Sequence, residues 1–283
     1  MILGIFIINL SQHYYMLSNK LIIWGILSLF IATYPCVADD YRDTAKPIAT
    51  LKFDISGSSA WYPYFIPDAE HPGIVAELVS AVLARANILG VPTELPPKRT
   101  LMALEKGELD FDVTSPSWFA GHKIPEGFVI SEGLIEIREY LVTLPENQHL
   151  FSTLDQMHHQ QIGTVRGYLY NNDAMFERVD FNSEYQLIKA LQIGRIQAVI
   201  MGDLPASYWA EQIGINIAYG AQHSEGDLHF RLREEHAHLL APINKAIDNL
   251  KNEGKVEQIT SHYIKHTEQN SSSKLVNPSL LAN

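Results

Sequence analysis

Stretches with the two-residue period of a strand alternate along this chain with stretches that have the 3.6-residue period of a helix. Residues 48–55 (IATLKFDI) alternate apolar and polar side chains before a Gly/Ser loop, which predicts a strand. In residues 73–87, Ile74, Leu78 and Val82 fall on one stripe, which predicts a helix that faces a core. Strands and helices that alternate at this spacing form βαβ units with a largely parallel sheet. The first half also predicts a strand at 91–95, a helix at 98–106 that ends at Gly107, and a strand at 111–114.

A second α/β set follows an extended segment at residues 136–144. Another extended run, at 228–232, precedes two closing helices. Two α/β sets connected by two extended segments predict two lobes, each a mainly parallel sheet flanked by helices, with a cleft between them that suits a small ligand. The second set consists of a strand at 161–165, a helix at 184–193 and a strand at 198–201; the expected lobes are 39–143 with 230–266, and 144–229.

Composition and charge exclude several classes of function. With 46% hydrophobic residues over 283 positions, the chain is too apolar for a disordered protein and can bury a large core. The formal net charge of −11 disfavours a nucleic-acid partner, which needs clustered Lys and Arg. The single cysteine, Cys36, excludes a disulfide framework and a cysteine-rich metal site. Because GxSxG, HExxH, P-loop and Rossmann glycine motifs are also absent from the sequence, we expect no cofactor and no metal.

The first forty residues have the pattern of an export signal. Lys20 precedes an apolar run at 21–32, and the small residues Cys36 and Ala38 occupy the −3 and −1 positions of a cleavage site. The run is shorter than the ~20 residues that span a bilayer, so it predicts a signal peptide at 1–38 rather than a membrane anchor. The residues before Met16 add nothing to the pattern, which favours Met16 as the translation start. Residues 267–283 lack any period and predict a disordered tail.

Several short motifs follow one another between residues 48 and 264. They are Tyr62-Pro63-Tyr64-Phe65, GIVAEL at 73–78, ALEKGELD at 103–110, Ile162-Gly163 with Arg166-Gly167, GRIQAVI at 194–200 and NEGKVEQITSHYI at 252–264. In this order and spacing they resemble the family 3 bacterial extracellular solute-binding proteins, the periplasmic amino-acid-binding type. The resemblance implies a type II periplasmic-binding-protein fold, in which two lobes hinged by two strands close over a small polar solute. It also implies a periplasmic location and delivery of the solute to an inner-membrane ABC-type transporter.

The resemblance selects aromatic and polar ligand contacts in both lobes. Aromatic residues after the first strand pack against the ligand in the family, which indicates Trp61, Tyr62 and Tyr64; alternatively, some of these rings only pack beneath the loop. In the second lobe, Tyr168 stands where the family has small hydroxyl residues. Asp203 lies one residue beyond the family's ammonium-binding Asp, and its alternative role is that of a helix N-cap.

The loop after the third strand departs from the family at one position. Thr114, Ser115 and Ser117 supply the hydroxyl groups, but the Arg that binds the ligand carboxylate is replaced by His122. Histidine bonds at one point and changes charge with pH, whereas Arg offers a permanent bidentate fork, and His122 is alternatively an ordinary surface residue. Either the ligand is not an α-amino acid, or its carboxylate is held by Lys123, Arg99 or Arg166.

Three classes of function fit these residues. The resemblance favours a monomeric periplasmic binding protein for an amino acid or another small polar solute, with an ABC permease as partner and no nucleic acid. The second class is an enzyme on the same scaffold, similar to dehydratases of cyclic amino-acid precursors, with Glu77, His122 or Asp203 as general acid or base. The third is a sensory or partner-binding module that feeds no transporter.

Overall fold

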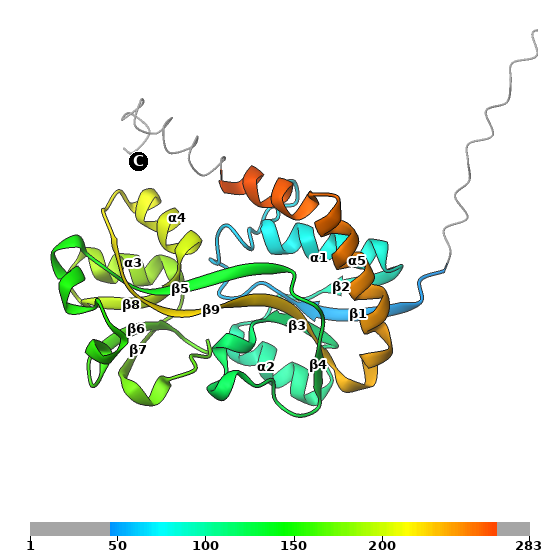
Figure 1. The fold of residues 1–283 in the computed structure, drawn as a ribbon, viewed down its shortest axis with the longest axis horizontal. Coiled ribbons are helices and arrows are strands. Elements are labelled where there is room, and N and C mark those ends of the chain that lie inside the picture. Colours follow the sequence, from blue (N-terminus) through cyan, green and yellow to red (C-terminus); the bar gives the residue numbers. More distant parts are fainter. Residues whose placement is uncertain (1–45, 265–283) are drawn as a thin grey trace, which may run out of the picture. The chain divides into compact units, whose positions relative to one another are not determined.

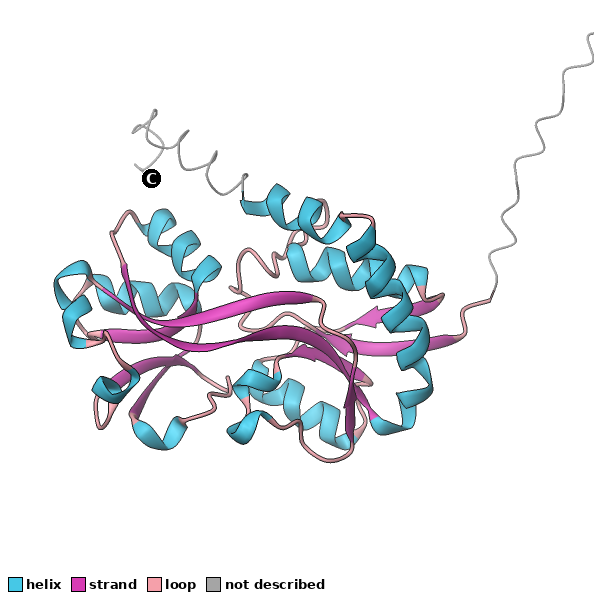
Figure 2. Ribbon diagram, viewed as in Figure 1, coloured by secondary structure: helices cyan, strands magenta, loops and turns pink. Residues whose placement is uncertain are grey.

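The computed structural model describes residues 46–264, which form a nine-stranded mixed sheet with helices on both faces (Figure 1, Figure 2). The strand order is β2-β1-β3-β9-β5-β8-β6-β7, and β4 pairs with β9. The predicted signal peptide at 1–38 and the predicted tail at 267–283 lie outside the described residues. Between residues 46 and 264, no helix combines the length and the apolar character needed to cross a bilayer.

Lobe 1 is built around β1 (Ala49–Asp54), which pairs in parallel with β2 (Ile88–Pro92) and β3 (Phe111–Thr114). Its core contains the predicted apolar stripe of α1 (Ile74–Arg85), packed with buried residues of α5 (Leu240–Asn252). Figure 1 shows α1 and α5 on one face of this sheet and α2 on the other. The remaining elements are α2 (Pro97–Lys106), β4 (Phe128–Ile130) and a last helix at 255–264.

The second strand lies three residues earlier than the predicted 91–95. After α1 the chain turns at Asn87, which adopts a positive φ of 55°, and Ile88 then pairs directly with Ala49 at the start of β1. Further along, the Leu95 N–H donates to the Asp54 carboxylate instead of to a neighbouring strand. The Thr93 N–H still donates to the Phe53 carbonyl of β1, so the backbone hydrogen bonds to β1 stop between Thr93 and Leu95.

Lobe 2 is built around β6 (Gln161–Val165), which pairs in parallel with β7 (Glu177–Phe181) and β8 (Ala198–Gly202). Buried residues of α3 (Glu184–Gln192) and α4 (Asp203–Ile213) form one core cluster with these strands. A second cluster contains Phe151, Met157, Tyr170 and Phe176, which come from the segments before and after β6.

Two long strands connect the lobes. We call β5 (Ile135–Thr143) and β9 (Ala218–Arg233) the hinge strands; they pair with each other in antiparallel register. At one end β9 pairs with β3 of lobe 1, and at the other β5 pairs with β8 of lobe 2, so both cross between the lobes (Figure 1). The register shifts twice near Tyr140, in the middle of the pair. The expected extended run at 228–232 is thus the end of a 16-residue strand.

Candidate functional site

A cavity lies between the two lobes. Its empty volume is about 750 Å³, which includes space open to solvent. Lobe 1 contributes the end of β1, the start of α2 and the end of β3, while lobe 2 contributes the loop after β6. The lining includes Trp61, Asp112, Trp118, Glu139, Tyr168 and Arg231.

A second cavity of about 390 Å³, again including space open to solvent, adjoins the first. Both are lined by Trp61, Trp118, Glu139 and Tyr168. These four residues therefore form the common wall of one interlobe site. Three of them are aromatic and the fourth, Glu139, is acidic.

Tyr168 connects the lobes at this wall. The backbone N–H of Ser58, in lobe 1, donates to the Tyr168 hydroxyl at 3.0 Å, and this hydroxyl donates to Glu184 Oε1 at 2.9 Å. The Ser58 hydroxyl also donates to Glu184. The approach requires a glycine at position 57, because Gly57 has a φ of 56° and an added Cβ would lie 2.7 Å from the Tyr168 hydroxyl.

Burial governs the protonation of this interlobe contact. Burial, together with the nearby Glu184 carboxyl, raises the pKa of Tyr168 well above its ordinary value. Burial also raises the pKa of Glu184, although hydrogen bonds from Ser58 and Tyr168 partly offset the shift. Tyr168 consequently stays neutral and acts as both donor and acceptor between the lobes.

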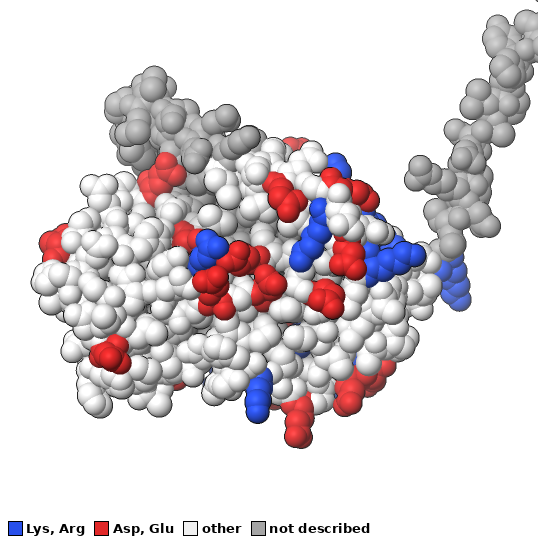
Figure 3. Space-filling model, viewed as in Figure 1, with Lys and Arg blue, Asp and Glu red and all other residues white. Residues whose placement is uncertain are grey.

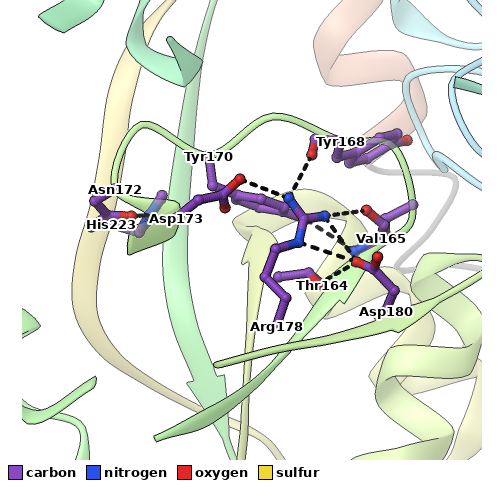
Figure 4. Close-up of polar contacts among 9 residues, drawn as sticks. All are labelled: Thr164, Val165, Tyr168, Tyr170, Asn172, Asp173, Arg178, Asp180 and His223. Carbon is purple, nitrogen blue, oxygen red and sulfur yellow. Dashed lines mark hydrogen bonds and ion pairs between the residues drawn. The ribbon is translucent and has the colours of Figure 1, made fainter. Parts of the chain in front are cut away.

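A network centred on Arg178 holds the loop that carries Tyr168 (Figure 4). From β7, the Arg178 guanidinium donates to the carbonyl oxygens of Val165 at 3.2 Å and Tyr168 at 3.1 Å. It also pairs with Asp173 and Asp180, each at 2.9 Å. Both ends of the loop are therefore tied to one strand, which limits the positions that the Tyr168 ring can take.

The lobe 1 side of the cavity is formed by two carboxylates and one guanidinium. Asp54 and Asp112 are direct partners in the β1–β3 register. Asp54 accepts hydrogen bonds from the Ser56 N–H and hydroxyl, the Leu95 N–H and the Thr100 hydroxyl. Asp112 accepts from Arg231 Nε at 2.9 Å and Nη2 at 2.5 Å. Burial raises the pKa of Asp112, and Arg231 offsets only part of this effect.

Glu139 lies at the irregular middle of the hinge strands. Its Oε2 accepts a hydrogen bond from the Ser224 hydroxyl at 2.6 Å and lies 3.6 Å from Nδ1 of the buried His223. No hydrogen bond to its Oε1 is formed within residues 46–264. The side chain is 12% exposed and lines both cavities. Glu139 is therefore a nearly buried carboxylate whose Oε1 accepts no hydrogen bond from the described residues.

The predicted site residues divide into several groups. Trp61, Tyr64, Thr114 and Tyr168 each line one or both cavities. Ser115 and Ser117 lie behind the lining, where their hydroxyls bond each other at 2.9 Å. The structure thus brings Trp61, Tyr64 and Thr114 of the first lobe to the cavities that Tyr168 of the second lobe lines.

Tyr62 lies outside the cavity linings, in a contact between the lobes. Its ring stacks on Tyr208 with centroids 4.9 Å apart and meets the edge of Trp209 at 5.1 Å. Trp209 Nε1 donates to the Ala60 carbonyl at 2.8 Å. We call Tyr62, Tyr208 and Trp209 the interlobe aromatic cluster. Burial and the neighbouring Tyr62 raise the pKa of Tyr208 to about 12.

The predicted charged contacts lie away from the two linings. Arg99, Lys123 and Arg166 are exposed and line neither cavity. His122 is also exposed and lies 3.4 Å from the Asn171 side-chain amide. Asp203 begins α4 and accepts from the Leu204 N–H at 2.7 Å, and burial raises its pKa.

Sequence reasoning missed the charged residues that do line the cavities. Asp112 and Arg231 stand within the apolar strands FDV and FRL, and Glu139 interrupts β5. A charged residue in an otherwise apolar strand is a usable signal, because burial of a charge requires a partner. The sequence alone does not show that Asp112 and Arg231 pair with each other, because they are 119 positions apart.

One group of possible metal ligands lies elsewhere. Ligand atoms of Asp110, Glu235 and His236 lie within 4.8 Å of one another, at the start of the segment that follows β9. His236 bonds Asp110 at 3.0 Å, and Glu235 pairs with Arg233 at 3.3 Å. These groups are already engaged with protein partners, and none of them lines either cavity.

The comparisons with known proteins identify the fold. No family model and no curated protein sequence matches the chain. Among solved structures, the GluR0 ligand-binding core in complex with L-glutamate matches with a TM-score of 0.65 at 19% identity, covering 76% of this chain and 97% of that one. A periplasmic binding protein of an arginine transport system from Legionella pneumophila matches with a TM-score of 0.61 at 18% identity, covering 76% and 99%.

A third solved structure is a histidine kinase sensor domain with similarity to periplasmic binding proteins. It matches with a TM-score of 0.62 at 14% identity and covers 76% of this chain and 95% of that one. At these identities the similarity concerns the fold. The chain has the two-lobed periplasmic-binding-protein fold that the family resemblance implied, and the alternation of strands and helices had predicted its two α/β lobes.

Proposed function

We propose that this protein captures a small polar solute between its two lobes and delivers it to an ABC-type transporter. The observation that carries the proposal is the interlobe cavity, whose lining comes from both lobes and both hinge strands. A solute in this cavity contacts both lobes and both hinge strands, so its binding favours the closed arrangement of the lobes. We further propose that the mature protein is a periplasmic monomer released from its signal peptide.

Solved structures with this fold support the proposal. They include proteins in complex with glutamate or arginine and substrate-binding proteins of amino-acid ABC transporters. The acid–base residues suggested for an enzyme, Glu77, His122 and Asp203, line neither cavity. Glu77 instead accepts from the Tyr263 hydroxyl at 2.5 Å.

Thermal unfolding of residues 39–283 in the presence of amino acids, peptides, organic acids and polyamines tests solute capture. A solute at a hundredfold its Kd adds about 2.7 kcal/mol of stability. In a protein of this size, that corresponds to a rise in Tm of roughly 5–10 °C. Trp61→Ala should abolish the shift while the protein stays folded. If no solute shifts the Tm of the folded wild-type protein, the proposal is wrong.

A sensory role is the second candidate, because a histidine kinase sensor domain has the same fold. A strain that lacks this gene distinguishes the two roles once a solute is known. Lost uptake of the labelled solute supports transport, whereas normal uptake with a lost transcriptional response supports sensing.

A further inference from the structure

We propose that the solute is an organic cation without a carboxylate group, held by Glu139 and by the rings of Trp61, Trp118 and Tyr168. This inference rests on the proposed solute-binding function and names its substrate class. It departs from an α-amino acid, whose carboxylate needs a free cationic partner.

The lining of the larger cavity is acidic. It contains the carboxylates of Asp54, Asp112 and Glu139 against one basic side chain, Arg231. In the adjoining cavity Glu139 and Glu184 face Arg138, an exposed residue that pairs with Glu136 at 2.6 Å. Carboxylates outnumber basic groups in both linings, so the site attracts a positive charge and opposes a negative one.

Arg231 is not a free anchor for a solute carboxylate. Its guanidinium forms a bidentate pair with Asp112, and the rings of Phe119 and Phe128 lie 5.5 and 5.2 Å from its central carbon. Asp54, the register partner of Asp112, adds a second negative charge beside this pair. A carboxylate that approached Arg231 would therefore meet two carboxylates as well as one cation.

Glu139 is the carboxylate best placed for a solute cation. Asp54 already accepts four hydrogen bonds. Within the described residues Glu139 accepts one, at Oε2, and its Oε1 accepts none. A nearly buried carboxylate with a free oxygen is stabilised by a cationic donor. An ammonium or guanidinium group at Oε1 supplies that donor.

Three rings share the wall with Glu139. Trp61, Trp118 and Tyr168 line both cavities, and aromatic faces bind organic cations by their quadrupole. Nε1 of Trp118 is buried and has no hydrogen-bond partner within residues 46–264. This neutral donor suits a neutral acceptor of the solute, such as a carbonyl or hydroxyl oxygen, and offsets none of the negative charge around it.

Matched ligand pairs test the charge requirement directly. Calorimetry of the wild-type protein compares arginine with argininamide and with agmatine, and lysine with cadaverine. In each pair the compounds share the side-chain cation, and the second lacks the carboxylate charge. We expect each carboxylate-free compound to bind about tenfold or more tightly than its amino acid. Equal or tighter binding of the amino acids, or binding of glutamate, overturns the inference while supporting solute capture.

Two variants identify the residue that carries the selectivity. Glu139→Gln should weaken binding of the preferred cation by about tenfold or more and reduce the preference over its amino acid. Glu136→Gln is the matched control on the same strand, because Glu136 is exposed and lines neither cavity. Figure 3 shows that acidic side chains gather over the middle of the hinge strands, so the control also tests long-range attraction. Equal losses in both variants contradict the role of Glu139.

If none of these compounds binds and no other solute shifts the Tm, the proposed function itself fails, and this inference fails with it. That outcome differs from selective binding of carboxylates, which overturns only the ligand class. Circular dichroism of each variant separates a lost contact from a lost fold.

Discussion

Glu184 links the two lobes through Ser58 and Tyr168, and its protonation follows from its burial. Because burial raises its folded-state pKa above the ordinary value, the folded protein holds this proton more tightly than the unfolded chain does. The stabilising effect of the proton is complete below the unfolded pKa of about 4.3 and is lost as the pH rises through the folded pKa.

We therefore expect Glu184→Gln to change the pH dependence of stability. The glutamine keeps the shape and carries no charge, so the free energy of unfolding of the wild type relative to the variant should fall as the pH rises from 4. Urea unfolding of both proteins between pH 4 and 7 measures this difference. A difference that is constant, or that grows with pH, would show that hydrogen bonding outweighs burial at Glu184.

At the scale of elements, β7 holds the loop between β6 and β7 through Arg178. The guanidinium also lies 5.1 Å from the centre of the Tyr170 ring, whose hydroxyl accepts from the Val165 N–H. A hydrogen bond to a charged group contributes about 1.5–3 kcal/mol to stability. Because Arg178 forms several of them, the conformation of the loop depends strongly on this side chain.

Arg178→Gln should loosen the loop at 166–173 without unfolding lobe 2. We expect faster hydrogen exchange of the backbone amides in this loop, because both of its ends lose a charged donor. Arg195→Gln is the control, since exposed Arg195 contacts the Phe181 ring on the same lobe. Unchanged exchange in the loop, or equal changes throughout lobe 2, would contradict the local role of Arg178.

At the scale of the whole molecule, the interlobe aromatic cluster favours closure. Tyr62 belongs to lobe 1, whereas Tyr208 and Trp209 belong to α4 of lobe 2. Tyr62→Ala should weaken solute binding while the fold persists, because the ring lies outside the core clusters and stabilises one arrangement of the lobes. Aromatic pairs contribute about 0.5–1.5 kcal/mol each beyond their buried area, which predicts a loss in affinity of about fivefold or more.

Calorimetry gives the affinity of the Tyr62→Ala variant, and small-angle X-ray scattering gives its radius of gyration without solute. Tyr185→Ala is the control, because Tyr185 meets the edge of Trp209 within lobe 2. An unchanged affinity in Tyr62→Ala, or an equal loss of affinity in Tyr185→Ala, would show that the interlobe aromatic cluster does not stabilise the closed arrangement.

Local pattern predicted most of the fold but only part of the site. The stripe in α1 and the alternation in β1 follow from period, because each element buries the face that its own sequence makes apolar. Trp61, Thr114 and Tyr168 were selected by the family resemblance, and the structure places all three in the lining of the larger cavity. The strand predicted at 91–95 begins three residues earlier because its backbone pairs with β1, which is distant in sequence, from Ile88 opposite Ala49 onward.

By itself, then, the sequence determined the order of strands and helices, the two-lobed α/β class and the loops that face the cleft. The tertiary structure decided which charges enter that cleft, as in the pair of Asp112 with Arg231, 119 positions apart. It also decided which neutral contacts connect the lobes, as in the hydrogen bond from Ser58 to Tyr168, 110 positions apart. Period is a local property that each segment carries alone. The free energy of a buried charge depends on the partner that folding brings to it, and that partner is specified only when the strands are paired.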